Sequence, residues 1–268
     1  MLVEKLMKPE ELDDAHRFMD GISVYIQPLL NKSRQQRPQV IGTALLVEDN
    51  GAYYIVSAAH VLKNINSIFF YPGGDQPRKI TGALELTHPF GEMGSSDRLD
   101  LGVARLLGGP MPPYEDWRAL PIAVLRRQTL PRPTEQYCFA GFPSSRGKAN
   151  PLTKIIKISP TGLMRMPTAF SKAEQLGLSE ASHLIFDVDR KAVTRGGSAW
   201  ELPVLNGISG SPIWCADEKG AHIVGIAIEY HREKKLLVAT DIGVVLDLIE
   251  AVRKETDEIL TENPDAFD

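Results

Sequence analysis

The 268-residue chain has few cysteines, no excess of basic residues and no long apolar run, and each shortage excludes a class of protein. Two cysteines are too few for the disulfide framework of a small secreted domain. No stretch approaches the roughly 20 apolar residues that a membrane-spanning helix needs. The net charge of -4 differs from that of a typical nucleic-acid-binding domain, which carries a basic face. We therefore expect neither a membrane nor a nucleic acid as a partner.

The N-terminus also lacks the pattern of a secretory signal. It reads MLVEKLMKPEELDDAHRFMD, with no basic start followed by a long apolar stretch. The composition, with 43% hydrophobic and 24% charged residues, is that of an ordinary soluble globular protein. We therefore expect a cytoplasmic protein that buries a full hydrophobic core.

What the chain does have is two groups of short runs rich in β-branched and aromatic residues, which are separated by Gly, Pro, Asn and Asp. The first group covers residues 23–29, 39–47, 52–57, 67–71, 79–86 and 101–106. The second group covers residues 137–142, 153–159, 183–188, 210–215, 222–230 and 236–240. Because no helical pattern separates the runs, they predict an all-β fold of sandwiches or barrels rather than a parallel α/β sheet.

Helical patterns occur near the two ends of the chain. Residues 9–20 predict a short N-terminal helix that ends at Gly21, and residues 244–260 predict an amphipathic C-terminal helix. A stretch rich in Gly and Pro at 107–135 predicts the connection between the two groups of strands. The predicted domains are an N-terminal arm at 1–21, a first β unit at 22–125, a second β unit at 126–243, and a C-terminal helix and tail at 244–268.

The segment NGISGSP, at residues 206–212, contains a serine in a glycine-rich loop. A nucleophilic serine needs a sharply bent backbone and amide N–H groups that can point at a developing oxyanion. Gly207 and Gly210 allow such a bend, and the amides of Gly207 and Ser209 could form the oxyanion hole. Taken alone, a segment of this kind is more often a turn between two strands.

A histidine ends the β-branched run in the segment IVSAAHVL, at residues 55–62. His60 follows the small Ala58 and Ala59, which leave space beside its ring. A single histidine at such a place is more often an ordinary packed residue, although strand ends are where catalytic groups tend to be displayed.

An aspartate precedes the alternating strand in the segment DRLDLGVARL, at residues 97–106. The carboxylate of Asp100 could accept a hydrogen bond from a histidine and orient its ring. Asp97 is the alternative for this role, and an aspartate at a strand start often bonds to its own backbone instead. His60 and Asp100 lie in the first group of strands and Ser209 in the second, so the three together predict a site between the two halves.

These segments resemble the motifs of the trypsin-like serine peptidases. SAAH at residues 57–60 looks like their histidine motif, DLGVARL at 100–106 looks like their aspartate segment, and NGISGSP looks like their nucleophile loop. CFAGFP at 138–143 is similar to a strand of the bacterial members, and HIVGIAI at 222–228 is similar to the strand that lines the substrate cleft. The resemblance runs over residues 22–248 and implies two six-stranded antiparallel β-barrels with the active site in the cleft between them.

The resemblance also implies an activity. It is that of a serine endopeptidase, which hydrolyses peptide bonds through an acyl-enzyme on Ser209, with His60 as general base and acid and Asp100 orienting it. The amides of Gly207 and Ser209 would form the oxyanion hole, and a protein or peptide substrate would pair with the segment 226–230 as an added strand. The residues implied in substrate binding are Pro203, Ile226, Ala227, Ile228 and Tyr230. We expect no cofactor and no metal.

Three features of the chain qualify what the resemblance implies. Ile208 stands where the digestive members have the aspartate that receives a newly cut N-terminus, so we expect no zymogen switch of that kind. No acidic residue stands at the expected pocket floor near Pro203, and together with Ile228 and Leu236 this predicts a small or apolar P1 side chain rather than Arg or Lys. The long stretch 166–206 could carry a flap or a regulatory loop over the cleft.

Cys138 and Cys215 fall on strands that the family places side by side, and secreted relatives have a disulfide in this neighbourhood. Cys138 is one position out of register, and a one-residue shift turns a strand side chain to the opposite face of the sheet. Together with the expected cytoplasmic location, this predicts two reduced, buried thiols.

Two other functions are compatible with the same motifs. One is a double barrel that binds peptides without cutting them, and the other is a protease that stays latent until a regulatory protein partner reshapes the 166–206 region. Because the sequence keeps all three of His60, Asp100 and Ser209, it favours a peptidase or its latent form over a pure binding module.

Overall fold

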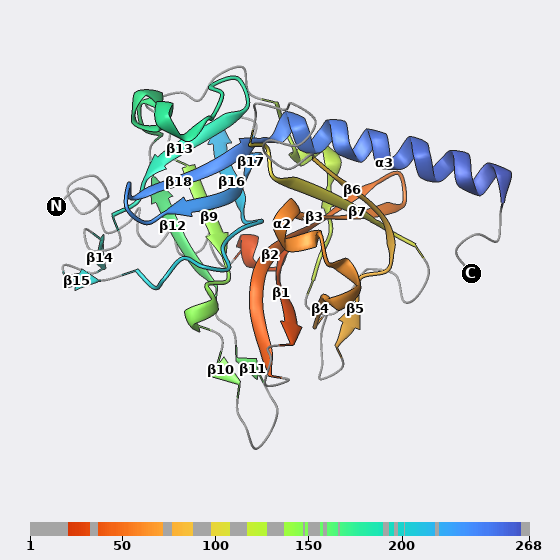
Figure 1. Cartoon of the computed structure of the whole chain (residues 1–268), viewed down its shortest axis with the longest axis horizontal. Coiled ribbons are helices and arrows are strands. Elements are labelled where there is room, and N and C mark those ends of the chain that lie inside the picture. The colour runs from red at the N-terminus through yellow and green to blue at the C-terminus, as the bar shows by residue number, and fades with distance from the viewer. Residues whose placement is uncertain are drawn as a thin grey trace.

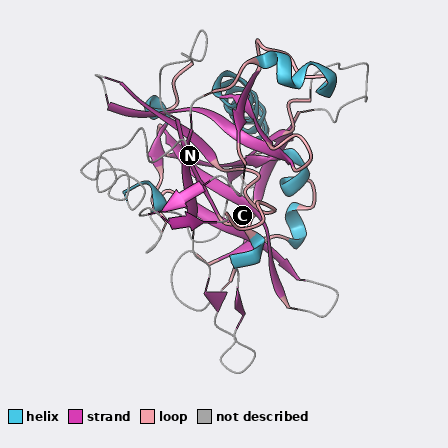
Figure 2. Cartoon of the chain, turned by 90° about the vertical axis from the view of Figure 1, so that its left-hand side faces the viewer, coloured by secondary structure: helices cyan, strands magenta, loops and turns pink. Residues whose placement is uncertain are grey.

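The computed structural model describes residues 21–32, 37–71, 77–87, 98–107, 117–127, 137–146, 148–149, 156–157, 160–165, 167–189, 193–195, 198–200, 202–217 and 220–263. Strands make up most of the molecule, and the long C-terminal helix lies along one side of it (Figure 1, Figure 2). The strands form two main sheets, one in each half of the chain, which confirms the predicted all-β fold.

The first sheet has the strand order β5-β4-β1-β2-β3-β7-β6. Its strands are β1 (Ile26–Lys32), β2 (Pro38–Asp49), β3 (Ala52–Ala58), β4 (Phe69–Phe70), β5 (Arg78–Lys79), β6 (Gly82–Leu86) and β7 (Leu101–Leu106). They pair antiparallel, whereas the short β8 (Leu120–Pro121) pairs parallel to β2. The β2–β3 hairpin turns at Asn50 and Gly51, whose φ angles of 51° and 81° are those of a type I′ turn.

The second sheet has the strand order β12-β9-β16-β17-β18-β13, and its strands pair antiparallel. Its strands are β9 (Tyr137–Gly141), β12 (Thr161–Arg165), β13 (His183–Asp187), β16 (Pro212–Asp217), β17 (Gly220–His231) and β18 (Leu236–Asp241). Two small ladders stand apart from it, formed by β10 (Lys148–Ala149) with β11 (Ile156–Lys157) and by β14 (Val193–Arg195) with β15 (Ser198–Trp200). The short helices are α2 (Ala59–Leu62), η1 (Ile65–Ser67), η2 (Ile122–Val124), η3 (Ser144–Arg146) and η4 (Phe170–Leu176).

Two hydrophobic cores lie on opposite faces of the second sheet. Cys138 belongs to one of them and Cys215 to the other. Across the two strands Cys138 pairs with Trp214, and Cys215 pairs with Tyr137. The cysteines are therefore one position out of register, and both are buried thiols that no disulfide joins, as predicted.

The C-terminal helix α3 (Ile242–Glu262) runs from the end of the second sheet onto the first, where it packs on β7 and β6 (Figure 1). Asp241 caps it by accepting a hydrogen bond from the amide of Gly243 at 2.7 Å. Burial raises the pKa of the Asp241 carboxyl. Farther along, Arg105 of β7 donates to Asp257 at 2.7 Å. The helix thus links the two sheets, and the predicted C-terminal helix is confirmed with two more residues at each end.

Some predicted elements differ from those of the structure. The run at 79–86 is divided between β5 and β6, the first sheet holds more than six strands, and β12 was not predicted. Residues 21–23 are helical, so Gly21 does not end a helix, while residues 9–20 lie outside the described residues. The predicted domain boundaries stay predictions. In the described part of the chain, no helix has the length and apolar character needed to cross a membrane.

Candidate active site

His60 lies in a one-turn helix that follows β3 directly. Its neighbours in α2, Ala59, Val61 and Leu62, are buried. Since these three pack inward, the remaining position of the turn faces outward, and 47% of the His60 side chain is exposed. The small and apolar residues around this histidine therefore anchor the turn that displays it.

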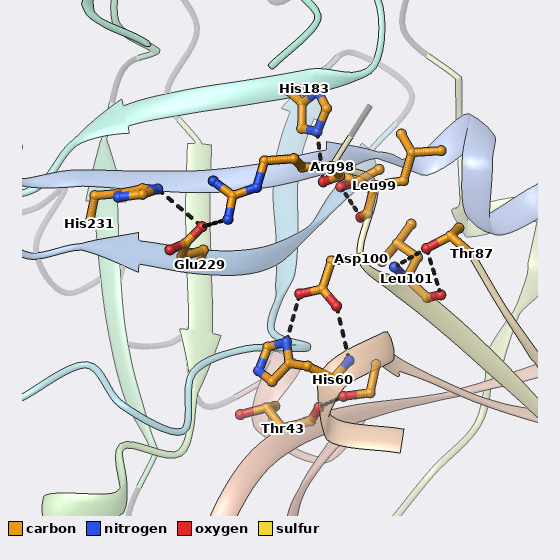
Figure 3. A network of polar contacts seen from close by, with 12 residues as sticks. Thr43, His60, Thr87, Arg98, Leu99, Asp100, Leu101, His183, Glu229 and His231 are labelled. Atoms are coloured by element: carbon orange, nitrogen blue, oxygen red, sulfur yellow. Dashed lines mark hydrogen bonds and ion pairs between the residues drawn. The ribbon is translucent and has the colours of Figure 1, made fainter. Parts of the chain in front are cut away.

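Asp100 lies directly before β7 and faces His60 (Figure 3). One carboxylate oxygen lies 2.6 Å from Nδ1 of His60, and the other accepts a hydrogen bond from the His60 amide at 2.9 Å. The Asp100 carbonyl accepts a further bond from the amide of Ala59 at 2.9 Å. Because an ionised carboxylate only accepts hydrogen bonds, Nδ1 carries the proton and Nε2 of the neutral ring is an acceptor. Asp97, the alternative partner, lies outside the described residues.

Ser209 lies in a loop whose backbone contacts the first sheet. Its carbonyl accepts a hydrogen bond from the amide of Thr43, in β2, at 2.8 Å. The next residue, Gly210, has a φ of 92°. A Cβ at Gly210 would lie 1.9 Å from the Thr43 carbonyl oxygen and 2.2 Å from Oγ of Ser57. Any other residue would place its Cβ against these atoms, so only a glycine lets the loop come this close to the sheet.

A β-turn at residues 205–208 precedes Ser209. The amide of Ile208 donates to the carbonyl of Leu205 at 3.2 Å. Gly207, the third residue of the turn, has a φ of 93°, which a type II turn requires at this place. A glycine is therefore needed at position 207 because of the backbone conformation of the turn.

A second contact fixes the orientation of the peptide group that contains the Gly207 amide. The carbonyl of Asn206 accepts a hydrogen bond from the amide of Ser144 at 2.7 Å. In a planar trans peptide the C=O and the following N–H point in opposite directions. The Gly207 N–H is therefore turned away from Ser144.

Thr43, which the sequence analysis did not single out, ties this loop to the first sheet. Its hydroxyl donates to the Gly207 carbonyl at 3.0 Å and accepts from the amide of Phe142 at 3.0 Å. The residue is fully buried. Its partners Phe142 and Gly207 lie 99 and 164 residues away in the chain, so no local pattern could have marked Thr43.

His60, Asp100, Gly207 and Ser209 line one groove of about 500 Å³ between the two halves of the chain. The structure thus brings the predicted histidine, aspartate and serine to one site. Within the described residues, no hydrogen bond joins the Ser209 hydroxyl to the imidazole of His60. Hydrogen bonds between a nucleophile and its base are often long or poorly aligned before substrate binds.

Two of the predicted substrate-binding residues, Ile228 and Tyr230, line the same groove. The structure places the other three elsewhere. Ile226 and Ala227 are fully buried in the two cores, because successive strand residues face opposite sides of the sheet. A bulge in β17 at Ile228 then changes the register. Pro203 is half-buried and is not among the residues that line the groove.

A charged cluster that the sequence did not reveal lies at the groove. Arg98 and Glu229 both line it, with Nη2 of Arg98 3.8 Å from Oε2 of Glu229 (Figure 3). Nε2 of His231 lies 3.0 Å from the same carboxylate oxygen. Arg98 is remote from Glu229 and His231 in sequence, so no local pattern brings the three together. Among the described residues, no group of three or more His, Cys, Asp or Glu side chains could hold a metal ion.

A comparison with solved structures agrees with this architecture, whereas two other comparisons found no match. No family model and no curated protein matches the chain. Among solved structures the chain is similar to neuropsin, a serine protease expressed in the limbic system of mouse brain. The TM-score is 0.55 at 15% sequence identity, and the similarity covers 86% of this chain and 95% of that chain. The predicted chymotrypsin-like double-barrel fold is confirmed by this likeness.

Proposed function

We propose that this protein is a serine endopeptidase in which Ser209 attacks the peptide bond, His60 transfers the proton and Asp100 orients His60. The observation that carries the proposal is the 2.6 Å contact between Nδ1 of His60 and Asp100, in a groove that Ser209 also lines. With Nδ1 protonated, Nε2 is the base that a serine hydroxyl needs. The fold shared with a serine protease supports the same reaction class by analogy.

The reaction would proceed in two halves. The oxygen of Ser209 bonds to the substrate carbonyl carbon while its proton passes to Nε2 of His60. His60 then donates this proton to the leaving amine as the C–N bond breaks, and the acyl group stays on Ser209. A water molecule gives a proton to His60, attacks the acyl-enzyme and releases the acid, after which the proton returns to Ser209.

The amides of Gly207 and Ser209 are the proposed oxyanion hole. The Asn206 carbonyl is held by Ser144, so the peptide that carries the Gly207 N–H cannot rotate without losing that bond. Donors that are fixed before the reaction stabilise the developing charge without reorganisation. The turn at 205–208 therefore supports a preformed hole.

We also propose that the groove accepts a small or apolar P1 side chain. Leu205 and Ile228 contribute apolar walls to the groove. A peptide library randomised at P1 tests this proposal. Cleavage after small or apolar residues is expected, and a profile dominated by Arg or Lys would contradict it.

Substitution of the nucleophile tests the proposed reaction. With a peptide substrate, Ser209→Ala should lower kcat by on the order of 10⁶-fold, and His60→Ala should have a comparable effect. Ser211→Ala is the matched control, because its buried hydroxyl makes no hydrogen bond within the described structure. Wild-type turnover that persists in Ser209→Ala would reject the proposal.

The latent protease and the non-cleaving peptide-binding protein are separated by the same measurements. A latent protease would cleave only after a protein partner is added, and Ser209→Ala would abolish that cleavage. A peptide-binding protein would bind peptides in the groove and cleave none with or without a partner.

A further inference from the structure

Asp100 has a backbone conformation that is unfavourable for a residue with a side chain. Its φ is 44°, in the left-handed region, which aspartate adopts more readily than most residues but still rarely. Leu101 follows directly as the first residue of β7. The chain therefore changes direction at the residue whose carboxylate faces His60, and the surrounding contacts must hold this conformation.

Two buried side chains of the second sheet bind the carbonyl groups just before Asp100, and Figure 3 labels one of them, His183, beside Arg98. The hydroxyl of Thr240 donates to the Leu99 carbonyl at 2.6 Å, and Nε2 of His183 lies 3.1 Å from the Arg98 carbonyl. Thr240 and His183 are buried, and they stand opposite each other on the paired strands β18 and β13. They form a pair that reaches from the second sheet to the segment leading into Asp100.

Both ring nitrogens of His183 lie within hydrogen-bond distance of polar groups. The Arg98 carbonyl only accepts hydrogen bonds, so Nε2 carries the proton. Nδ1 lies 3.2 Å from the amide nitrogen of Ser179 and 3.1 Å from the hydroxyl of Ser182, both of which can donate to it, and 3.0 Å from the Ser179 carbonyl oxygen. Both ring nitrogens thus have partners, which a buried imidazole needs.

The first sheet fixes the chain on the other side of Asp100. Oγ1 of Thr87 accepts a hydrogen bond from the Leu101 amide at 2.9 Å, and the Thr87 amide donates to the Leu101 carbonyl at 2.8 Å. Asp100 therefore lies between a first-sheet anchor after it and a second-sheet anchor before it. Its conformation depends on both sheets being in place.

We infer that Thr240 and His183 are positioning residues, which orient the carboxylate of Asp100 toward His60 by holding the backbone ahead of it. Loss of this anchor lets the left-handed residue relax and turns the carboxylate away from Nδ1. The kinetic consequence rests on the proposed peptidase function, whereas the structural consequence does not.

The kinetic test compares two changes at Thr240. Thr240→Val removes the hydroxyl at nearly constant size and should lower kcat by about 10- to 100-fold with KM little changed, while Thr240→Ser keeps the hydroxyl and should restore kcat. In an Asp100→Asn background, Thr240→Val should have little further effect, because the two residues act through one contact. Thr256→Val is the matched control, since it removes a buried hydroxyl that donates to Val252 within α3, and kcat should not change.

The structural test follows the proton between His60 and Asp100 by NMR and needs no substrate. Its low-field signal should shift or broaden in Thr240→Val and stay in place in Thr256→Val. His183→Leu, with His183→Gln as the donor-keeping variant, repeats the measurement at the second anchor.

Two results would overturn the inference. One is an unchanged signal with unchanged kcat in folded Thr240→Val and His183→Leu. The other is an equal loss of kcat for Thr240→Val with Asp100 present or replaced. A protein that cleaves nothing but whose signal depends on Thr240 would instead reject the peptidase function and support the positioning role.

Discussion

The two sides of the candidate site are held together by different kinds of contact. His60 and Asp100 meet through a side-chain contact of 2.6 Å, whereas the Ser209 loop is held by backbone groups, by the Thr43 hydroxyl and by glycines at positive φ. The first side depends on which side chains are present, and the second depends on the absence of a side chain at Gly207 and Gly210. Substitutions on the first side should therefore change the chemistry and spare the fold, while substitutions on the second should change the fold first.

Asp100→Asn tests the side-chain half of the site. Peptidase kcat should fall by on the order of 10⁴-fold, because an amide does not hold His60 in the required tautomer. The fold should persist, since asparagine tolerates a positive φ. Asp189→Asn is the matched control, because Asp189 pairs with Lys235 away from the groove. Full activity of Asp100→Asn would remove the distinction between the two sides.

Gly210→Ala tests the backbone half. The new Cβ would meet the Thr43 carbonyl oxygen at 1.9 Å, so we expect the free energy of unfolding to fall by about 3 kcal/mol in urea titrations. Gly220→Ala is the control, because Gly220 has a φ of 103° but no atom near its Cβ position. That change should cost only about 1 kcal/mol. Equal losses of unfolding free energy in the two variants would show that residue 210 is a glycine because of its positive φ, and not because of the close contact with Thr43.

Thr43→Val, which weakens the contact between the Ser209 loop and the first sheet, should destabilise the protein less than Gly210→Ala does. It leaves the Phe142 amide and the Gly207 carbonyl without the partner that the hydroxyl provides. We expect a loss of about 2 kcal/mol in the free energy of unfolding. Thr43→Ser keeps the hydroxyl and should recover most of it. If Thr43→Ser is as unstable as Thr43→Val, packing of the methyl group and not the hydrogen bonds holds the loop.

The smallest response is expected from the thiols in the second sheet. Burial raises the pKa of Cys138 to about 12, so its thiol stays protonated at mildly alkaline pH and lacks the reactive thiolate. Neither Cys138 nor Cys215 should react with a disulfide reagent in the folded protein, and both should react in denaturant without a reductant. Fast reaction of the folded protein would show that this sheet opens readily.

Local sequence patterns sufficed for much of the fold. The strand β7 has the bounds that its alternating apolar residues predict, and the His60 turn and the Ser209 loop occur where their motifs indicated. The second-sheet strand β12 was missed, since its TGLMR sequence has little strand pattern of its own. It is a strand because it pairs with β9, and strand formation depends on such partners.

Residues that act across long separations were also missed. Thr43, Arg98 and Glu229 belong to the candidate site because they contact segments that are far away in the chain. Ala227 is buried and does not line the groove, and the register of β17 changes at the bulge at Ile228 directly after it. Register irregularities of this kind are set by the paired strands and cannot be derived from one strand alone.

The most direct test of the central claim is the reaction of the intact chain with a fluorophosphonate, followed by mass spectrometry of its peptides. A single adduct on Ser209 is expected in the wild type, with none on Ser211 and none in His60→Ala over the same time. An adduct on another serine, or a wild type and a His60→Ala variant that react at the same rate, would contradict the claim that His60 activates Ser209.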